Sequence, residues 1–314
     1  MGRSKVLPYL SGLVMAVFFG ISFLMTQSAL QEMPPMVLMS YRFGVAAIVL
    51  TILRGLHVIR INYKNKPVRG VILLSVFYPG ISFFFETLSL QYVSSSQAGI
   101  LVSIMPLFVT AFGVLILKER PKKIQLFFIV ASVIGVAITV VFAKSKGDEG
   151  TFIGILLMLI SLLGGALNNV LSRKYSQYFT PIEITYMMIW IGAVIFTCIA
   201  IGQGLSDLQI LSAYKAPFCS LKTFFTVLEL SVGTSVIAFF CMNYMLSRLK
   251  AANASLFTNL ATVISIIAGI VIMKEKLYWY QIIGGVLIIL SVWGANYYEN
   301  GENTKKGGFA HGRK

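Results

Sequence analysis

The sequence contains few charged residues and few of the side chains on which enzyme chemistry depends. Only 12% of its 314 residues are charged, 11 of them acidic, and its two histidines are His57 and His311. It has no HExxH or GxSxG motif and no acidic cluster that would suit a metal ion. These absences argue against an enzyme and predict no metal or other cofactor.

Cysteine is also rare, and the three cysteines form no recognisable pattern. Cys198, Cys219 and Cys241 show neither a CxxC motif nor a paired spacing. Such spacings identify disulfide frameworks and cysteine-bound metals in a sequence. The sequence therefore predicts neither.

What the sequence has in abundance is apolar residues, which make up 57% of it and give a mean hydropathy of +0.83. A soluble domain carries about a quarter charged residues, roughly twice the fraction found here. A helix that crosses a bilayer needs about 20 mainly apolar residues. Ten segments meet this requirement: roughly 7–27, 35–53, 70–90, 97–117, 124–143, 151–172, 182–202, 223–246, 254–273 and 278–297. The sequence therefore predicts an all-α membrane protein with ten transmembrane helices, joined by connections no longer than the loop 203–222.

Topology accounts for the net charge of +15. If the N-terminus is cytoplasmic, 19 of the 26 Lys and Arg residues fall in cytoplasmic segments, and Arg42 lies within a span. The six on the other side are Lys144, Lys146, Lys215, Lys222, Lys274 and Lys276. Cytoplasmic loops of membrane proteins are enriched in Lys and Arg. We therefore expect a multi-pass protein of the bacterial cytoplasmic membrane, with both termini cytoplasmic and no nucleic-acid partner.

One charged motif occurs twice. The stretches ILKERPKKIQ (116–125) and IMKEKLYWYQ (272–281) share Ile, Lys, Glu and Gln at positions 156 residues apart, and both follow an apolar span. The chain is therefore interpreted as two five-helix repeats, residues 1–147 and 148–314. Because five crossings reverse the direction of the chain, the second repeat is inverted, an arrangement typical of secondary transporters.

Three longer stretches resemble a known family. They are FFGISFLMTQSALQEMPPMVLMSYRFGVAAIVL (18–50), YVSSSQAGILVSIMPLFVTAFGVLILKERPKKIQ (92–125) and the segment 231–290, which begins SVGTSVIAFFCMNYMLSRLK. They resemble the drug/metabolite transporter superfamily in its bacterial EamA branch, over nearly the whole chain. One departure is Thr262, which stands where the first repeat has Pro106, so that a bend often found in both halves is retained in one.

The resemblance implies a ten-helix secondary transporter that exports small metabolites, amino acids or amphipathic drugs by alternating access, driven by a proton or substrate gradient. In that fold the spans 70–90, 97–117, 223–246 and 254–273 line the central cavity. The implied partners are a small-molecule substrate and the lipid bilayer, with the chain a monomer or a homodimer. Two alternatives stay open: uptake by the same fold, and a membrane sensor or partner subunit of another complex.

Three charged residues lie within predicted spans: Arg42, Glu86 and Glu229. Charge within a bilayer is costly and usually faces a cavity or a partner. Each is therefore a candidate for substrate binding, and Glu86 is also one for proton binding. The alternatives are structural: an ion pair that fixes the helix of Arg42, with Glu86 as one partner, an interfacial carboxylate at Glu86, and a packing role for Glu229.

Prolines and uncharged polar residues complete the candidates. Pro79 and Gly80 predict a kink in the span 70–90 that frees a carbonyl group near Tyr78, and broken helices at mid-membrane often form binding sites. Pro106 predicts a second hinge. Further cavity candidates are Ser103, Asn168, Asn169, Asn243, Tyr244 and Asn259, for each of which interhelical hydrogen bonding is the alternative.

The charge distribution makes a testable prediction about orientation. Single cysteines introduced as Lys64→Cys and Lys276→Cys should lie on opposite sides of the membrane. In intact cells, a membrane-impermeant maleimide should label position 276, and it should reach position 64 only after permeabilisation. Labelling of both positions from outside would contradict the inverted repeat.

Overall fold

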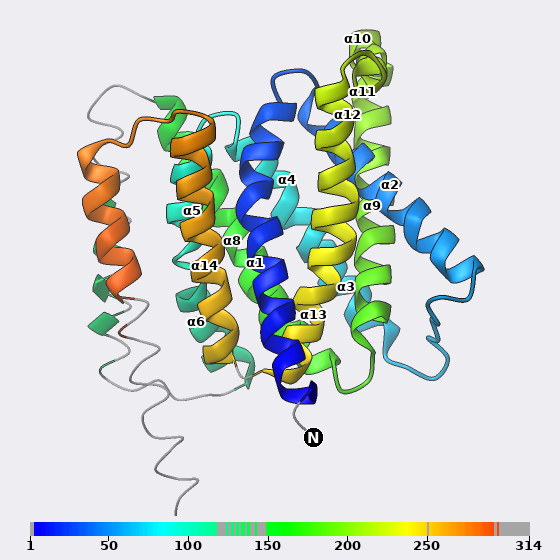
Figure 1. The fold of residues 1–314 in the computed structure, drawn as a ribbon, viewed down its shortest axis with the longest axis horizontal. Helices are drawn as coiled ribbons and strands as arrows, with labels where there is room; N and C mark the ends of the chain where they lie inside the picture. Colours follow the sequence, from blue (N-terminus) through cyan, green and yellow to red (C-terminus); the bar gives the residue numbers. More distant parts are fainter. Residues whose placement is uncertain are drawn as a thin grey trace, which may run out of the picture.

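The computed structural model describes residues 3–117, 149–249 and 251–291, and separately residues 124, 127, 128, 130, 131, 133–135, 137, 138, 142 and 294. Its regular elements are all helices, and the described residues contain no strand. The helices run up and down a single bundle (Figure 1). The all-α prediction is therefore confirmed for this part of the chain.

Within the described residues, five long helices are continuous: α1 (Arg3–Ala29), α2 (Pro35–Gly55), α8 (Glu149–Tyr175), α9 (Pro181–Ser206) and α14 (Ala251–Ile272). Three further spans are each built from consecutive segments. They are α3–η1–α4 (Val68–Ser75, Val76–Ile81, Ser82–Ser89), α5–α6 (Ser95–Val102, Met105–Leu117) and α12–η3–α13 (Leu221–Leu228, Glu229–Ala238, Phe239–Arg248). The segments η1 and η3 are wound as π-helix.

Seven helical stretches of the described chain are long and apolar enough to cross a membrane. Two shorter apolar helices, Phe257–Ile272 and Trp279–Ser291, lie where the ninth and tenth spans are predicted. The fifth predicted span, 124–143, falls mostly outside the described residues. The chain is thus a multi-pass membrane protein, while the number of ten spans and their inverted repetition stay predictions.

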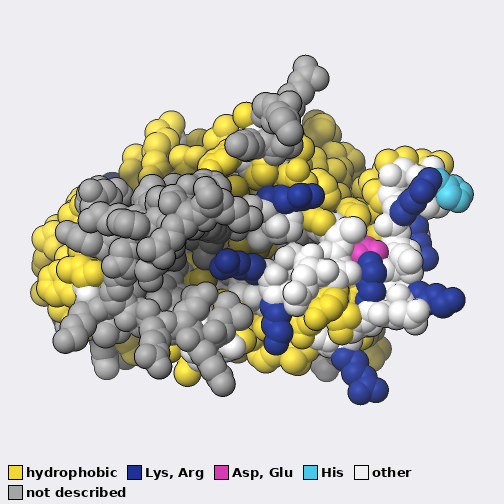
Figure 2. Space-filling model, turned by 90° about the horizontal axis from the view of Figure 1, so that it is seen from below, with side chains coloured by type: hydrophobic (Ala, Val, Ile, Leu, Met, Phe, Trp, Pro, Cys, Tyr) yellow, Lys and Arg dark blue, Asp and Glu magenta, His cyan; other side chains and the backbone are white. Residues whose placement is uncertain are grey.

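The surface of the bundle has the two kinds of face that a membrane protein needs. Large apolar side chains point outward along its sides, among them Ile48, which is 61% exposed, and Leu115, which is 74% exposed. Lys and Arg side chains gather at the end that holds the N-terminus (Figure 2). There α2 and α8 finish in basic last turns, with Arg54 in α2 and Arg173 and Lys174 in α8.

The connection 203–222, treated above as a loop, is largely helical. The helix α9 continues to Ser206, and α10 (Leu208–Ser212), the 3-10 turn η2 (Ala213–Lys215) and α11 (Ala216–Cys219) follow. Capping explains these short helices, because the Asp207 side chain accepts a hydrogen bond from the Gln209 N–H group. The connection is therefore helical over much of its length, because a polar cap begins a new helix directly after α9 ends.

Two spans are broken at mid-length beside a proline. Tyr78 has non-helical backbone angles (φ −143°, ψ 113°), which kink the chain between α3 and α4, and the peptide bond from Tyr78 to Pro79 is cis. A two-residue gap separates α5 from α6, and Pro106 is the second residue of α6. Proline lacks the N–H group that would continue the helical hydrogen bonds, and its ring clashes with the preceding turn. By contrast, α14 runs unbroken through Thr262.

This asymmetry makes a prediction about motion. Pro106→Ala supplies the missing N–H group and should stiffen the break, so we expect a several-fold lower maximal rate of transport in proteoliposomes. The half-saturation concentration should stay nearly unchanged, because the substitution alters a conformational step and not a substrate contact. The matched control Thr262→Ala should be much milder. Equal effects of the two substitutions, or a large loss of affinity with Pro106→Ala, would show that Pro106 shapes the binding site itself.

Candidate functional site

A fully buried arginine lies in the middle of the bundle. Arg42, on α2, has no exposed surface, and its Nε donates a hydrogen bond to Ser235 Oγ of η3 at 3.0 Å. Its other two nitrogens, Nη1 and Nη2, have no hydrogen-bond partner in the described chain. A buried guanidinium with two unused donor groups is costly to maintain. Nη1 and Nη2 are therefore free to bind an acceptor that the described residues do not supply.

Two carboxylates face this guanidinium without forming an ion pair with it. Glu86 of α4 and Glu229 at the start of η3 both attract its charge electrostatically. Glu229 Oε1 accepts a hydrogen bond from Thr234 Oγ1 at 2.8 Å, whereas its buried Oε2 has no partner among the described residues. Arg42 and the two carboxylates, termed here the Arg42 cluster, therefore include unused acceptors as well as unused donors.

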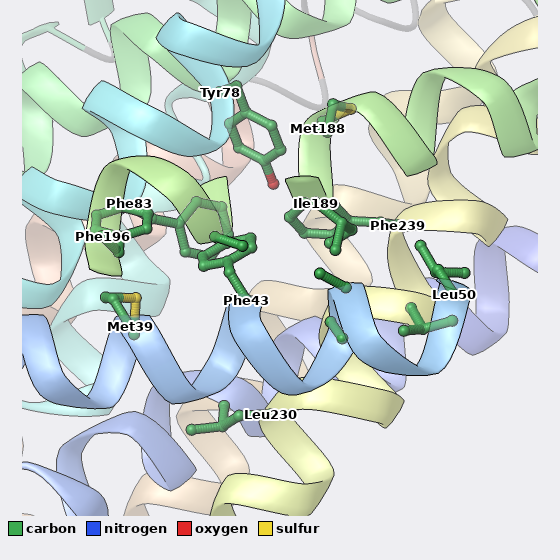
Figure 3. Packing of buried hydrophobic residues seen from close by; sticks show 14 of the residues in the cluster. Met39, Phe43, Leu50, Tyr78, Phe83, Met188, Ile189, Phe196, Leu230 and Phe239 are labelled. Atoms are coloured by element: carbon green, nitrogen blue, oxygen red, sulfur yellow. The ribbon is translucent and has the colours of Figure 1, made fainter. Parts of the chain in front are cut away.

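Aromatic rings form one wall of the Arg42 cluster. The Arg42 Cζ atom lies 4.5 Å from the centroid of the Phe83 ring, within the range of a cation–π interaction. Around Phe83, the ring of Tyr78 lies 5.2 Å away, that of Phe43 5.6 Å and that of Phe239 5.7 Å. Figure 3 shows how Phe43, Tyr78, Phe83 and Phe239 converge from different helices. The rings of Phe43, Phe83 and Phe239 are at most 1% exposed, so they give the guanidinium a buried aromatic environment.

The irregular segments of two spans place these side chains. The break at Tyr78 lets its ring turn toward Phe239, with the two centroids 5.5 Å apart. In η3 the Ser235 hydroxyl donates to Leu230 O at 2.9 Å, five residues back, which leaves its oxygen available to Arg42 Nε. Gly80 lies in η1, next to the break. A Cβ added there would lie 3.1 Å from Ile195 Cδ1, so a larger residue would crowd this side chain.

The structure brings together four of the ten predicted cavity residues: Arg42, Tyr78, Glu86 and Glu229. Four others are not joined to them by any hydrogen bond or ring contact among the described residues: Ser103, Asn168, Asn169 and Asn259. The Ser103 hydroxyl donates to Ile100 O at 2.5 Å, and Asn169 Nδ2 to Met105 Sδ at 3.4 Å. The Oδ1 atoms of Asn168 and Asn259 are buried without a partner in the described chain.

Asn243 and Tyr244, the remaining two, make packing contacts in this conformation. Asn243 Oδ1 accepts a hydrogen bond from Ser172 Oγ of α8 at 2.8 Å, and its Nδ2 donates to Thr185 Oγ1 of α9 at 3.0 Å. Such hydrogen bonds between neighbouring helices stabilise membrane bundles. The Tyr244 ring lies 5.9 Å from the guanidinium of Arg248, in the last turn of α13. The contacts of Asn243 are the interhelical alternative considered for it, whereas the Tyr244 ring contact lies within α13.

Sequence analysis missed several residues that shape the site. Ser235, Phe83 and Phe239 contact Arg42 or one another, yet none was a candidate. A weak signal exists for Ser235, because the run SVGTS (231–235) concentrates small polar residues within an apolar span. The phenylalanines carry no such signal, since an apolar span contains many phenylalanines that simply face lipid.

Comparison with known proteins identifies the family. The model of the EamA-like transporter family matches this chain twice, over residues 6–141 and 152–297. An uncharacterized transporter of Bacillus subtilis, YcxC, is 34% identical over 288 residues, which cover 92% of each chain. A "Probable amino-acid metabolite efflux pump" of Salmonella typhimurium is 20% identical over 285 residues, covering 90% of this chain and 92% of that one.

A solved structure extends the similarity to the fold. It superposes with a TM-score of 0.61 at 18% sequence identity and covers 93% of this chain and 97% of the other. At this identity the likeness concerns the fold alone. The family model matches both halves of the sequence, and YcxC is 34% identical over nearly its whole length. The chain therefore belongs to the EamA-like transporter family.

Proposed function

We propose that the chain is a secondary active transporter that exports a small amphoteric molecule, such as an amino acid or a close derivative, across the cytoplasmic membrane. The Arg42 cluster is the proposed binding site. The observation that carries the proposal is the pair of unpartnered nitrogens on a fully buried guanidinium. Nη1 and Nη2 of one arginine suit the two oxygens of a carboxylate, because the planar fork of donors matches that group bidentately.

The rest of the site suits the remaining groups of such a molecule. Glu86 and Glu229 provide acceptors for an ammonium group, and the rings of Phe83 and Phe239 provide apolar faces for a side chain. With both carboxylates ionised, the Arg42 cluster has one more negative than positive charge. A substrate ammonium group or a proton would each neutralise this excess, which provides a basis for coupling export to proton movement.

Alternating access between two inverted repeats, residues 1–147 and 148–314, is the proposed mechanism. Supporting it, the family model matches the chain once in each half, and the broken spans α3–α4 and α5–α6 belong to the first of them. The concentration of Lys and Arg at the N-terminal end of the bundle (Figure 2) supports cytoplasmic termini. Export is favoured by the name of the Salmonella relative, and a family of transporters points away from an enzyme.

The test is transport by purified protein in liposomes, with Glu86→Gln as the diagnostic substitution. Liposomes loaded with labelled amino acids should release one or more of them faster when they contain the protein and a proton gradient. The charged and titratable groups that face Glu86 are Arg42 and Tyr78, with Glu229 beyond Arg42. Because Gln keeps the shape of Glu86 and cannot exchange a proton, Glu86→Gln should lower the rate several-fold and flatten its dependence on pH.

Asp207→Asn is the matched control, because Asp207 is an exposed carboxylate at the start of α10 and asparagine also caps helices. It should transport as the wild type does, and all variants should yield equal amounts of folded protein. Wild-type flux of Glu86→Gln at every pH would assign Glu86 a structural role. Failure of the wild-type protein to move any amino acid would overturn the proposed substrate class.

A further inference from the structure

The carboxylate of Glu275 binds the first turn of a helix in the other half of the chain. Its Oε1 accepts hydrogen bonds from Ser95 N–H at 2.9 Å and from Ser95 Oγ at 2.8 Å, and its Oε2 accepts one from Ser96 N–H at 2.9 Å. Both serines are fully buried and begin α5. Three donors of α5 therefore hold the Glu275 side chain, which lies in the connection after α14 and 180 residues from Ser95 in the sequence.

The backbone after α14 is shaped to deliver this side chain. Lys274 adopts a positive φ of 54°, the left-handed conformation that often ends helices. The Glu275 N–H group then donates back to Gly269 O at 3.2 Å, which turns the chain toward α5. Gly269 has no room for a side chain, because an added Cβ would collide with Ser96 Oγ and with Glu275 Oε2. The contact therefore depends on a close approach of α14 to α5.

The first N–H groups of α5 need an acceptor from outside the helix. Among the described residues, Ser94 as the N-cap accepts only from Gln97 N–H, so the N–H groups of Ser95 and Ser96 need other acceptors. A carboxylate at a helix N-terminus also offsets the partial positive charge there. The remaining partner is Gln27 of α1, whose Oε1 accepts from Ser95 N–H at 3.2 Å. Separation of α14 from α5 would break three hydrogen bonds to a carboxylate at once and leave Gln27 to accept from Ser95 alone, which opposes opening.

We propose that Glu275 latches the end of the bundle at which α5 begins, and that this end opens only when the carboxylate releases Ser95 and Ser96. The latch holds α5 of the first half against α14 of the second. It rests on the alternating access proposed above, and it makes Glu275 a positioning residue that has no contact with the substrate. The latch is closed in the conformation described here.

The test measures opening directly and requires no substrate. In protein whose three cysteines are replaced, single reporters are introduced by Gln97→Cys, where the native side chain is 4% exposed, and by Ser103→Cys, where it is 0% exposed. The first reports on the start of α5 and the second on the break between α5 and α6. Glu275→Gln, which loses an acceptor atom and its charge, should raise the rate of maleimide labelling about tenfold at both positions.

Unchanged labelling at both positions would overturn the latch, and so would faster labelling at position 97 alone, which would mean local fraying of α5. The matched control is Glu183→Gln, which breaks the Lys66–Glu183 ion pair (2.6 Å) at the N-terminal end of the bundle and should leave both rates unchanged. If Glu275→Gln gives no folded protein, Glu275→Asp, which shortens the reach of the carboxylate, should raise labelling in the same direction.

The outcomes separate the latch from the proposed function. Faster labelling in Glu275→Gln, with no transport by the wild-type protein, would retain the latch and overturn the transport proposal. If the wild-type protein transports, and Glu275→Gln changes neither the transport rate nor the labelling rates, only the latch is overturned.

Discussion

The arrangement of the site depends on one constraint: a guanidinium sits inside a lipid-embedded bundle with two of its nitrogens unpaired. A charged residue at mid-membrane costs about 3 kcal/mol on insertion scales. One cation–π contact of about 2 kcal/mol when desolvated and one hydrogen bond of about 1 kcal/mol offset a cost of that size. Phe83 and Ser235 supply these two interactions, so Arg42 is tolerated without using Nη1 and Nη2. A bound carboxylate could therefore accept hydrogen bonds from both Nη1 and Nη2.

Two irregular segments of the bundle supply neighbours of this guanidinium. Non-helical backbone at membrane depth is tolerated where it is buried in protein or lines a cavity, and η1 and η3 both border Arg42. The break at Tyr78 turns an aromatic ring toward the site, and the wide turn in η3 presents Ser235 to α2. At the two ends of the bundle, carboxylates instead join a helix to a connection: Glu183 of α9 pairs with Lys66 before α3, and Glu275 after α14 accepts from Ser95 of α5. The bundle thus consists of long regular helices with irregular segments near its centre, and side-chain carboxylates make hydrogen bonds and an ion pair at its two ends.

The apolar runs and the polar residues between them predicted most of the helices, because a chain inside lipid has few alternatives to long apolar helices. The span 182–202, for example, is α9 with a few residues added at its C-terminal end. Breaks lie near Pro79 and Pro106, for which the sequence predicts hinges, and their role as hinges stays a prediction. Ser235 could not be found as the partner of Arg42, because the two are separated by 193 residues and meet only through the wide turn of η3. Asn243 illustrates the converse, since its residue type suggests a cavity whereas its neighbours Ser172 and Thr185 occupy its amide.

The most direct test of the account is whether ligand binding depends on a free carboxylate that Arg42 can accept. Each member of an amino-acid panel, its methyl ester and its decarboxylated amine are added to the purified protein, and the thermal midpoint of unfolding is measured, since a ligand that binds the folded state raises it. The account predicts that at least one amino acid raises the midpoint, that its ester and amine do not, and that Arg42→Met abolishes the effect. Equal stabilisation by the ester or the amine, an effect that persists in Arg42→Met, or no stabilisation by any amino acid would contradict it.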